Sequence, residues 1–197
     1  MSISYTPLIF GGSADIRLKL SDSSVLADYA FRPSGTAYGQ LCKHVTEFSS
    51  STIQTVGQYG LSGMSALKTL KLPNCTAIGN YGLQDADVLE GLELPNVISL
   101  GTYALETSSL AAGQASPLTV IELPKVQTVG TYAFRYRQTL ESVTLGSVGN
   151  PVTSIAANAF NSCTQSTLSI IIYTSDGSAL SGSPWGATNA NIEYRAA

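Results

Sequence analysis

The sequence has few charged residues. Aspartate, glutamate, lysine and arginine make up 12% of the 197 residues, about half of the roughly 25% that is usual in soluble domains. Ten basic residues stand against 13 acidic ones, for a net charge of −3, so there is no basic field to attract nucleic acid or an anionic membrane. We therefore expect a polar but nearly uncharged surface and no nucleic-acid partner.

Long apolar runs are also lacking. The longest lies near residues 170–173, far short of the roughly 18 residues that a membrane-spanning helix needs. The first residues, MSISYTPLIFGG, contain neither the basic stretch nor the long apolar stretch of a secretion signal. We expect no membrane span, and any export would depend on a signal outside this sequence or on another route.

Residues for metal binding or catalysis are scarce. The three cysteines, Cys42, Cys75 and Cys163, are spaced too widely for a metal cluster. The only histidine, His44, would share a strand face with Cys42, but no third residue is placed to orient that pair, so we interpret Cys42 as a free thiol. The sequence predicts no metal, no cofactor and no enzymatic activity.

What the sequence has in abundance is repetition. Four similar segments fill residues 53–145, and their landmark glycines are Gly57, Gly79, Gly101 and Gly130, at intervals of 22, 22 and 29 residues. The longer third segment carries its extra residues in SSLAAGQASP, which is typical of a surface loop. A period in the twenties indicates a solenoid, in which each unit buries its apolar face against its neighbours.

Each unit contains the same succession of local patterns. The pattern L-x-x-L-x-L predicts a short strand, because its last two apolar positions alternate with polar ones. A proline then separates this strand from a second half-buried step, V-x-x-I-G. The Tyr-Ala/Gly-Leu/Phe that follows is interpreted as one turn of helix or a 3₁₀ corner. In this register Cys75 matches Val97 and Val126, and Cys163 matches Met64 and Ala86, so both cysteines are predicted to be core residues.

The combined string L-x-x-L-x-L-P-x-V-x-x-I-G-x-Y-A-F resembles the BspA-like leucine-rich repeats of bacterial and protist surface proteins, over residues 53–174. It departs from them at Leu61, Leu83 and Leu105, which stand where that family usually has an aromatic residue. The resemblance implies a mostly β, right-handed solenoid with short strands and one-turn corners. It also implies adhesion to host or cell-surface proteins, from a bacterial surface or outside the cell.

We expect one domain over residues 1–197, with an N-terminal cap at 1–24, a degenerate first repeat at 25–52, about five repeats at 53–174 and a C-terminal cap at 175–197. The N-terminal cap is predicted to be a hairpin that covers the end of the stack.

Two features are predicted for the C-terminal region. The apolar stretch 168–173 predicts a strand covered on both faces, with the C-terminal segment folded back over it. Trp185 is predicted to plug the C-terminal cap, the alternative being an exposed anchor at a binding site.

Two surfaces are candidates for partner binding. One is a column on the predicted sheet that runs through Lys71, Glu93, Glu122 and Thr144, bounded by Glu47 and Ile172. The other is the corner at Arg135, Tyr136 and Arg137, whose residue types are favoured at interfaces. In each case the alternative is an ordinary solvated surface, with the arginine stems stacked on neighbouring residues in the second.

The sequence thus favours a monomeric, non-catalytic binding or adhesion module for a protein or glycan on host or neighbouring cells. A second hypothesis is a structural role, as a spacer or phage-type virion component whose repeats pack on other subunits. Oligomeric state distinguishes these two hypotheses.

Overall fold

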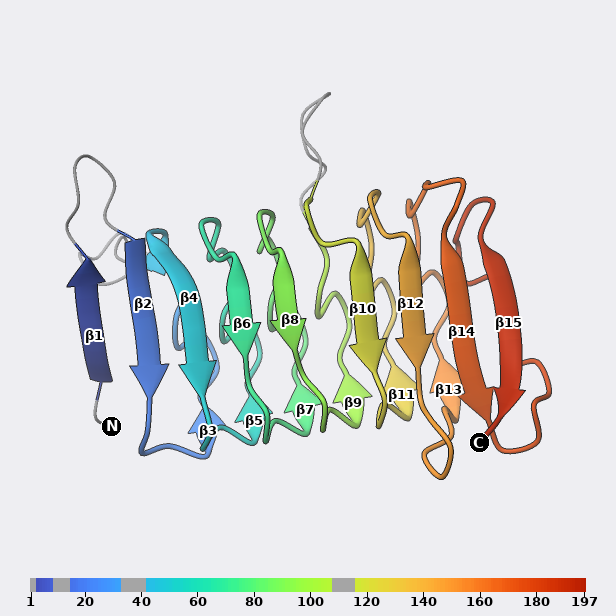
Figure 1. Ribbon diagram of the computed structural model, residues 1–197, viewed down its shortest axis with the longest axis horizontal. Coiled ribbons are helices and arrows are strands. Elements are labelled where there is room, and N and C mark those ends of the chain that lie inside the picture. The colour runs from blue at the N-terminus through green and yellow to red at the C-terminus, as the bar shows by residue number, and fades with distance from the viewer. Residues whose placement is uncertain (1–2, 9–14, 33–41, 108–115) are drawn as a thin grey trace.

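The computed structural model describes residues 3–8, 15–32, 42–107 and 116–197 (Figure 1). Most of the predicted long loop of the third repeat and most of the irregular segment after residue 32 lie outside the described residues. The described chain winds as a stack of coils, each of which contributes a strand to a front face and, in most coils, a two-residue strand to a back sheet. The predicted β-rich repeat solenoid is confirmed.

The front face consists of two sheets. The first is ordered β1 (Ile3–Leu8), β2 (Asp15–Leu20), β4 (Val45–Ser50), β6 (Thr69–Lys71) and β8 (Gly91–Glu93). The second is ordered β10 (Val120–Leu123), β12 (Ser142–Leu145), β14 (Ser169–Thr174) and β15 (Asn191–Ala196). All pairs are parallel except β1 with β2.

The back sheet is continuous along the stack. It contains β3 (Val25–Leu26), β5 (Thr55–Val56), β7 (Ala77–Ile78), β9 (Ser99–Leu100), β11 (Thr128–Val129) and β13 (Ser154–Ile155), all parallel and in that spatial order. Strand β9 pairs with β11 here, whereas β8 and β10 belong to different front sheets, so among the described strands only the front face is divided. Leu92, on the edge strand β8, is consequently only partly buried.

The core lies between the two layers. Alternate strand residues point inward, as the pattern predicts, and Leu70, Leu94, Leu123 and Val143 are each at most 1% exposed. Parallel coils stack this way because each leucine covers the leucine of the coil before it, which removes apolar surface from water.

The corners differ from the prediction of a helical turn. The Gly60 amide donates to the Gly57 carbonyl at 3.0 Å, and Tyr59 between them has φ of 54°. A positive φ at the third residue of a four-residue turn is typical of type II and interrupts any right-handed helix. The same left-handed conformation recurs at Tyr29, Tyr81, Tyr103, Tyr132 and Asn158.

The landmark glycines allow these corners to lie close together. A Cβ added to Gly79, Gly101 or Gly130 would lie 2.5–2.9 Å from atoms of the preceding coil. A side chain at these positions would therefore push neighbouring coils apart.

The two ends of the stack differ. At the N-terminal end, β1 pairs antiparallel with β2, which confirms the predicted hairpin. At the C-terminal end, Trp185 is 1% exposed, and its indole Nε1 donates to the Ser181 carbonyl at 2.9 Å, so it is a buried plug.

The prediction that β14 is covered on both faces is wrong. Strand β15 extends the sheet beside β14 and does not fold over it, so Ile171 on the outer face remains partly exposed. A nearly continuous apolar run was therefore a poor guide to the environment of this strand.

Candidate functional site

The front-face column is less regular than the sequence indicated. Lys71 and Glu93 lie side by side and form an exposed ion pair of 2.6 Å, whose hydrogen bond raises the pKa of Lys71. Glu122 lies beside Thr144, but in the second sheet, so the four residues do not form one continuous column.

The two ends proposed for the column are also wrong. Glu47 lies beside Thr69 and not beside Lys71, because the strand that contains it pairs two residues further along than expected. Ile172 points into the core and is 0% exposed, and Ile171 occupies the outer position beside Thr144.

The corners build a second, more regular surface, which we call the corner face. Its first row is a ladder of tyrosines whose ring centroids are 4.5–5.1 Å apart and whose planes differ by 4–17°. The ladder contains Tyr29, Tyr59, Tyr81, Tyr103 and Tyr132. Tyr29 is 50% exposed and the other four are partly buried. Because the rings stack on one another, it is chiefly their edges that meet solvent.

An arginine lies over each end of the ladder. The Arg32 guanidinium carbon is 5.6 Å from the ring centroid of Tyr29, the first ring, and 4.6 Å from that of Tyr59, the second. The Arg135 guanidinium carbon is 5.1 Å from Tyr132, the last ring, and 4.3 Å from Tyr136. Cations over aromatic faces are attracted by the ring quadrupole. The corner face is therefore a stiff row of aromatic rings with an arginine over each end.

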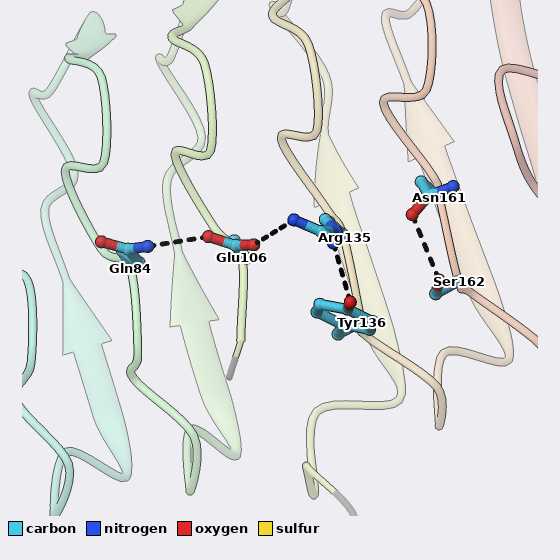
Figure 2. A network of polar contacts seen from close by, with 6 residues as sticks. All are labelled: Gln84, Glu106, Arg135, Tyr136, Asn161 and Ser162. Carbon is cyan, nitrogen blue, oxygen red and sulfur yellow. Dashed lines mark hydrogen bonds and ion pairs between the residues drawn. The ribbon is translucent and has the colours of Figure 1, made fainter. Parts of the chain in front are cut away.

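The corners also carry a polar row, whose residues come three positions after the ladder tyrosines in sequence, and Figure 2 shows its members Gln84, Glu106 and Arg135. The Gln84 amide donates to Glu106 Oε2 at 2.8 Å, and Arg135 Nη1 donates to Glu106 Oε1 at 3.3 Å. Arg135 Nη2 also donates to the Tyr136 hydroxyl at 2.7 Å. One coil further on, Ser162 donates to Asn161. Three successive coils are thus connected by side chains, with Arg135 held in one orientation.

Arg137 is not part of this surface, contrary to the sequence-based expectation. It is 0% exposed, and its guanidinium donates to the carbonyls of Leu105 and Ala86 and to the Ser116 hydroxyl. Burial lowers its pKa to about 10. Arg137 points inward because it occupies the register position of Met64, Ala86 and Cys163, all of which are core residues.

Glu106 makes the stability of the folded protein depend on pH. Its side chain is 8% exposed, and burial raises its pKa above the ordinary 4.5, although the hydrogen bond from Gln84 and the charge of Arg135 oppose that rise. Since the folded state favours the protonated acid, this group adds stability below pH 4.5 that is lost as pH rises through the raised pKa.

We therefore expect the free energy of unfolding of wild type to fall, relative to that of Glu106→Gln, as the pH rises across that window. Urea titrations of both proteins between about pH 4 and 7 at fixed ionic strength measure it. A difference that stays constant with pH would contradict the assignment.

All three cysteines are buried, and none of them forms a disulfide. Burial raises the pKa of Cys75 to about 11 and that of Cys163 to about 12, and it also raises the pKa of Cys42. The Cys163 thiol donates to the Phe134 carbonyl at 3.1 Å. The core positions predicted for Cys75 and Cys163 are confirmed, and Cys42 is buried as well.

Because the thiolate is the reactive form, we expect a disulfide-exchange reagent at about pH 8 to modify the folded protein slowly and all three thiols after denaturation. Rapid reaction of even one thiol in the folded protein would show that its burial is wrong. Absorbance of the released chromophore measures both rates.

Over the described part of the chain, no group of three or more histidine, cysteine and acidic side chains is placed to hold a metal ion. No helix in the same residues is long and apolar enough to cross a membrane.

Comparisons with known proteins agree with this architecture. Residues 112–178 match the family model described as a BspA type leucine-rich repeat region of six copies, which confirms the resemblance seen in the sequence. The fold is similar to the crystal structure of a leucine-rich repeat protein from Bacteroides ovatus ATCC 8483, with a TM-score of 0.55 and 19% identity. The alignment covers 87% of this chain and 48% of that protein, so this chain spans about half its length. No curated protein matches the chain.

Proposed function

Because this chain carries BspA-type leucine-rich repeats, we propose that it is a non-catalytic interaction module that recognises a protein or glycan on host or neighbouring cells. In this proposal the module is displayed on a bacterial surface or released outside the cell and acts in adhesion. Its stacked coils hold the binding residues rigid, so that little conformational entropy is lost when the partner binds.

The observation that carries this proposal is the corner face. Tyrosine and arginine are the types most often found at the energetic centre of interfaces, because they offer large contact area with a polar tip. Here Arg135 is fixed by Glu106 and Tyr136, and the tyrosines are fixed by one another. A surface ordered before binding supports recognition, and its proposed contacts are the ladder tyrosines Tyr81 and Tyr103 together with Arg135 and Tyr136.

The front-face residues Lys71, Glu93, Glu122 and Thr144 are the second candidate surface. Lys71 and Glu93 already form an ion pair with each other on the exposed surface. Exposed ion pairs of this kind contribute little free energy. We therefore place the main contact on the corner face.

Capture from extracellular-matrix and cell-surface extracts tests the proposal. The corner variant is Tyr81→Asn with Tyr103→Asn, because Asn158 occupies the same left-handed position in this chain and asparagine tolerates that conformation. The matched control reverses the charges of Lys71, Glu93 and Glu122. We expect a partner that is retained by the control and lost by the corner variant, with both folds checked by circular dichroism. Capture that survives the tyrosine changes but not the charge reversal would move recognition to the front face.

A further inference from the structure

The turns that lead from the front strands to the back strands form a shallow groove. It encloses about 450 Å³, which is within the range of small-molecule sites. It follows the turns after β4, β6, β8 and β10, at the lower edge of the stack in Figure 1. One lining residue is cationic and none is acidic. The lining residues are Gln54, Asn74, Thr76, Asn96, Ile98 and Lys125.

The two asparagines of this groove are held in one orientation. The side-chain amide nitrogen of Asn74 donates to the Ser51 carbonyl at 2.7 Å, and that of Asn96 donates to the Pro73 carbonyl at 2.6 Å. Each amide nitrogen is therefore bound to the preceding coil, so each Oδ1 points toward the following coil. The groove thus offers two amide oxygens whose positions are fixed before a ligand arrives.

Lys125 supplies the only charge in the groove. Its ammonium donates to Asn96 Oδ1 at 2.6 Å, which leaves two of its three protons for a ligand. The side chain is exposed, and none of the ion pairs between described residues includes it. An ammonium held beside an amide oxygen favours an anionic group on the ligand.

Apolar surface accompanies these polar groups. Ile98 is 41% exposed and lies one coil beyond Thr76, whose carbonyl accepts the Ile98 amide at 2.7 Å. The Thr76 hydroxyl donates to the Gln54 carbonyl at 3.1 Å, so its oxygen is still able to accept. A sugar ring has a C–H face that packs on apolar side chains and hydroxyl groups that bond to amides and hydroxyls. The groove has both kinds of partner.

The backbone beside the groove is already paired within the stack. The Thr76 amide donates to the Gln54 carbonyl at 2.7 Å, and the Gln127 amide donates to the Ile98 carbonyl at 2.8 Å. A peptide that binds as an added strand needs an unpaired backbone edge, and these residues offer none. Recognition must therefore use side chains, which favours a hydroxyl-rich ligand over an extended acidic peptide.

We propose that this groove binds an acidic saccharide, with the sugar carboxylate on Lys125 and ring hydroxyls on the amide oxygens of Asn74 and Asn96. The carboxylate accepts the two remaining ammonium protons in charge-assisted hydrogen bonds. Ile98 contacts the C–H face of the ring. Because the groove is shallow, binding is weak, with a dissociation constant of about 1 mM.

The groove is additional to the corner face. Within one coil, Thr76 precedes β7 and Tyr81 follows it, so the two surfaces lie at opposite ends of the back strands. The sugar test uses defined probes and not the captured partner, so either proposal can fail while the other stands. The Tyr81→Asn/Tyr103→Asn variant is expected to bind the sugars like wild type.

The test is titration with two acidic sugars, each beside its uncharged counterpart, followed by nuclear magnetic resonance of the asparagine side-chain amides. The probes are sialyllactose with lactose, and trigalacturonate with its methyl ester. At least one acid is expected to bind and to shift the amide signals of Asn74 and Asn96. Its uncharged counterpart is expected to bind at least about tenfold more weakly.

Lys125→Met is expected to weaken binding of the acidic sugar at least about tenfold, to the level of the uncharged sugar. Lys125→Arg keeps the charge and is expected to keep the preference for the acid. The matched control is Lys68→Met, which removes an exposed lysine outside the groove and is expected to bind like wild type. Circular dichroism of each variant checks the fold.

The proposal is overturned if neither acid binds up to about 10 mM, if the uncharged sugars bind equally well, or if Lys125→Met keeps wild-type affinity. Signal shifts that leave Asn74 and Asn96 unaffected would also overturn it. An N-acetylated triglutamate peptide that binds as tightly as the sugars would show that the groove recognises acidic peptides instead.

Discussion

Replacing Arg137 by alanine is expected to lower the free energy of unfolding by about 3–5 kcal/mol. The side chain is fully buried, and the change leaves the Leu105 carbonyl, 2.8 Å from Nε, without this donor in a dry environment. The same change opens a cavity between coils and removes the 2.6 Å bond to Ser116, which follows the long loop of the third repeat. Urea denaturation followed by far-ultraviolet circular dichroism measures the loss.

Arg137→Met is the matched variant, because it keeps most of the volume and removes the buried charge. Replacing a buried ion by an apolar side chain of similar size is often nearly neutral, so methionine is expected to recover a large part of the stability that alanine loses. An alanine variant that costs less than about 1 kcal/mol would mean that Arg137 is solvated in the folded protein.

Leu94→Ala and Leu123→Ala are each expected to cost about 2–5 kcal/mol, as other buried leucines do. Leu94 directly follows β8 and is 1% exposed, and Leu123 is the last residue of β10 and is 0% exposed. Each fills the space between neighbouring coils, so truncation leaves a cavity that the stacked backbone cannot close.

Val120→Ala is the control for these changes, since Val120 lies on the same strand as Leu123 but is 49% exposed. We expect it to change the stability by less than about 0.5 kcal/mol. Costs below about 1 kcal/mol for both leucines would refute the inward assignment of these strands.

The repeat architecture could be predicted because it depends on local periodicity. The alternation of Leu70 and Leu72 with polar residues determines which face of the strand is buried, and the same spacing recurs in every coil. The backbone conformation of the corner could not be predicted from local periodicity, because the left-handed conformation of Tyr59 is imposed by bonds to the neighbouring coil. The Tyr59 amide donates to the Asn80 carbonyl at 3.0 Å, a contact 21 residues distant in sequence.

The inward position of Arg137 has a signal in the sequence, although its residue type predicted a surface corner. The register that placed Cys163 beside Met64 and Ala86 places Arg137 in the same inward column. Arginine is seldom fully buried, so the residue type alone indicates the surface, whereas the register indicates the core. The buried carbonyl groups that accept its hydrogen bonds are visible only in the folded chain.

The tyrosine ladder also has a signal in the sequence. Tyrosine recurs two residues after each landmark glycine, and residues at one register position of a solenoid lie next to one another on successive coils. The corner face could therefore have been predicted as an aromatic row, whereas the contacts of Arg135 with Glu106 and Tyr136 depend on side-chain conformations.

The most direct test of the account is the dissociation constant of the captured partner, measured by calorimetry for wild type, the Tyr81→Asn/Tyr103→Asn variant and the front-face charge variant, at low and high salt. If the corner face is the binding surface, the tyrosine variant binds at least about tenfold more weakly, which corresponds to about 1.4 kcal/mol. The front-face variant then binds like wild type, and salt has little effect, because the contact is mainly aromatic. Full affinity in the tyrosine variant, with binding lost on charge reversal or at high salt, would contradict the central claim.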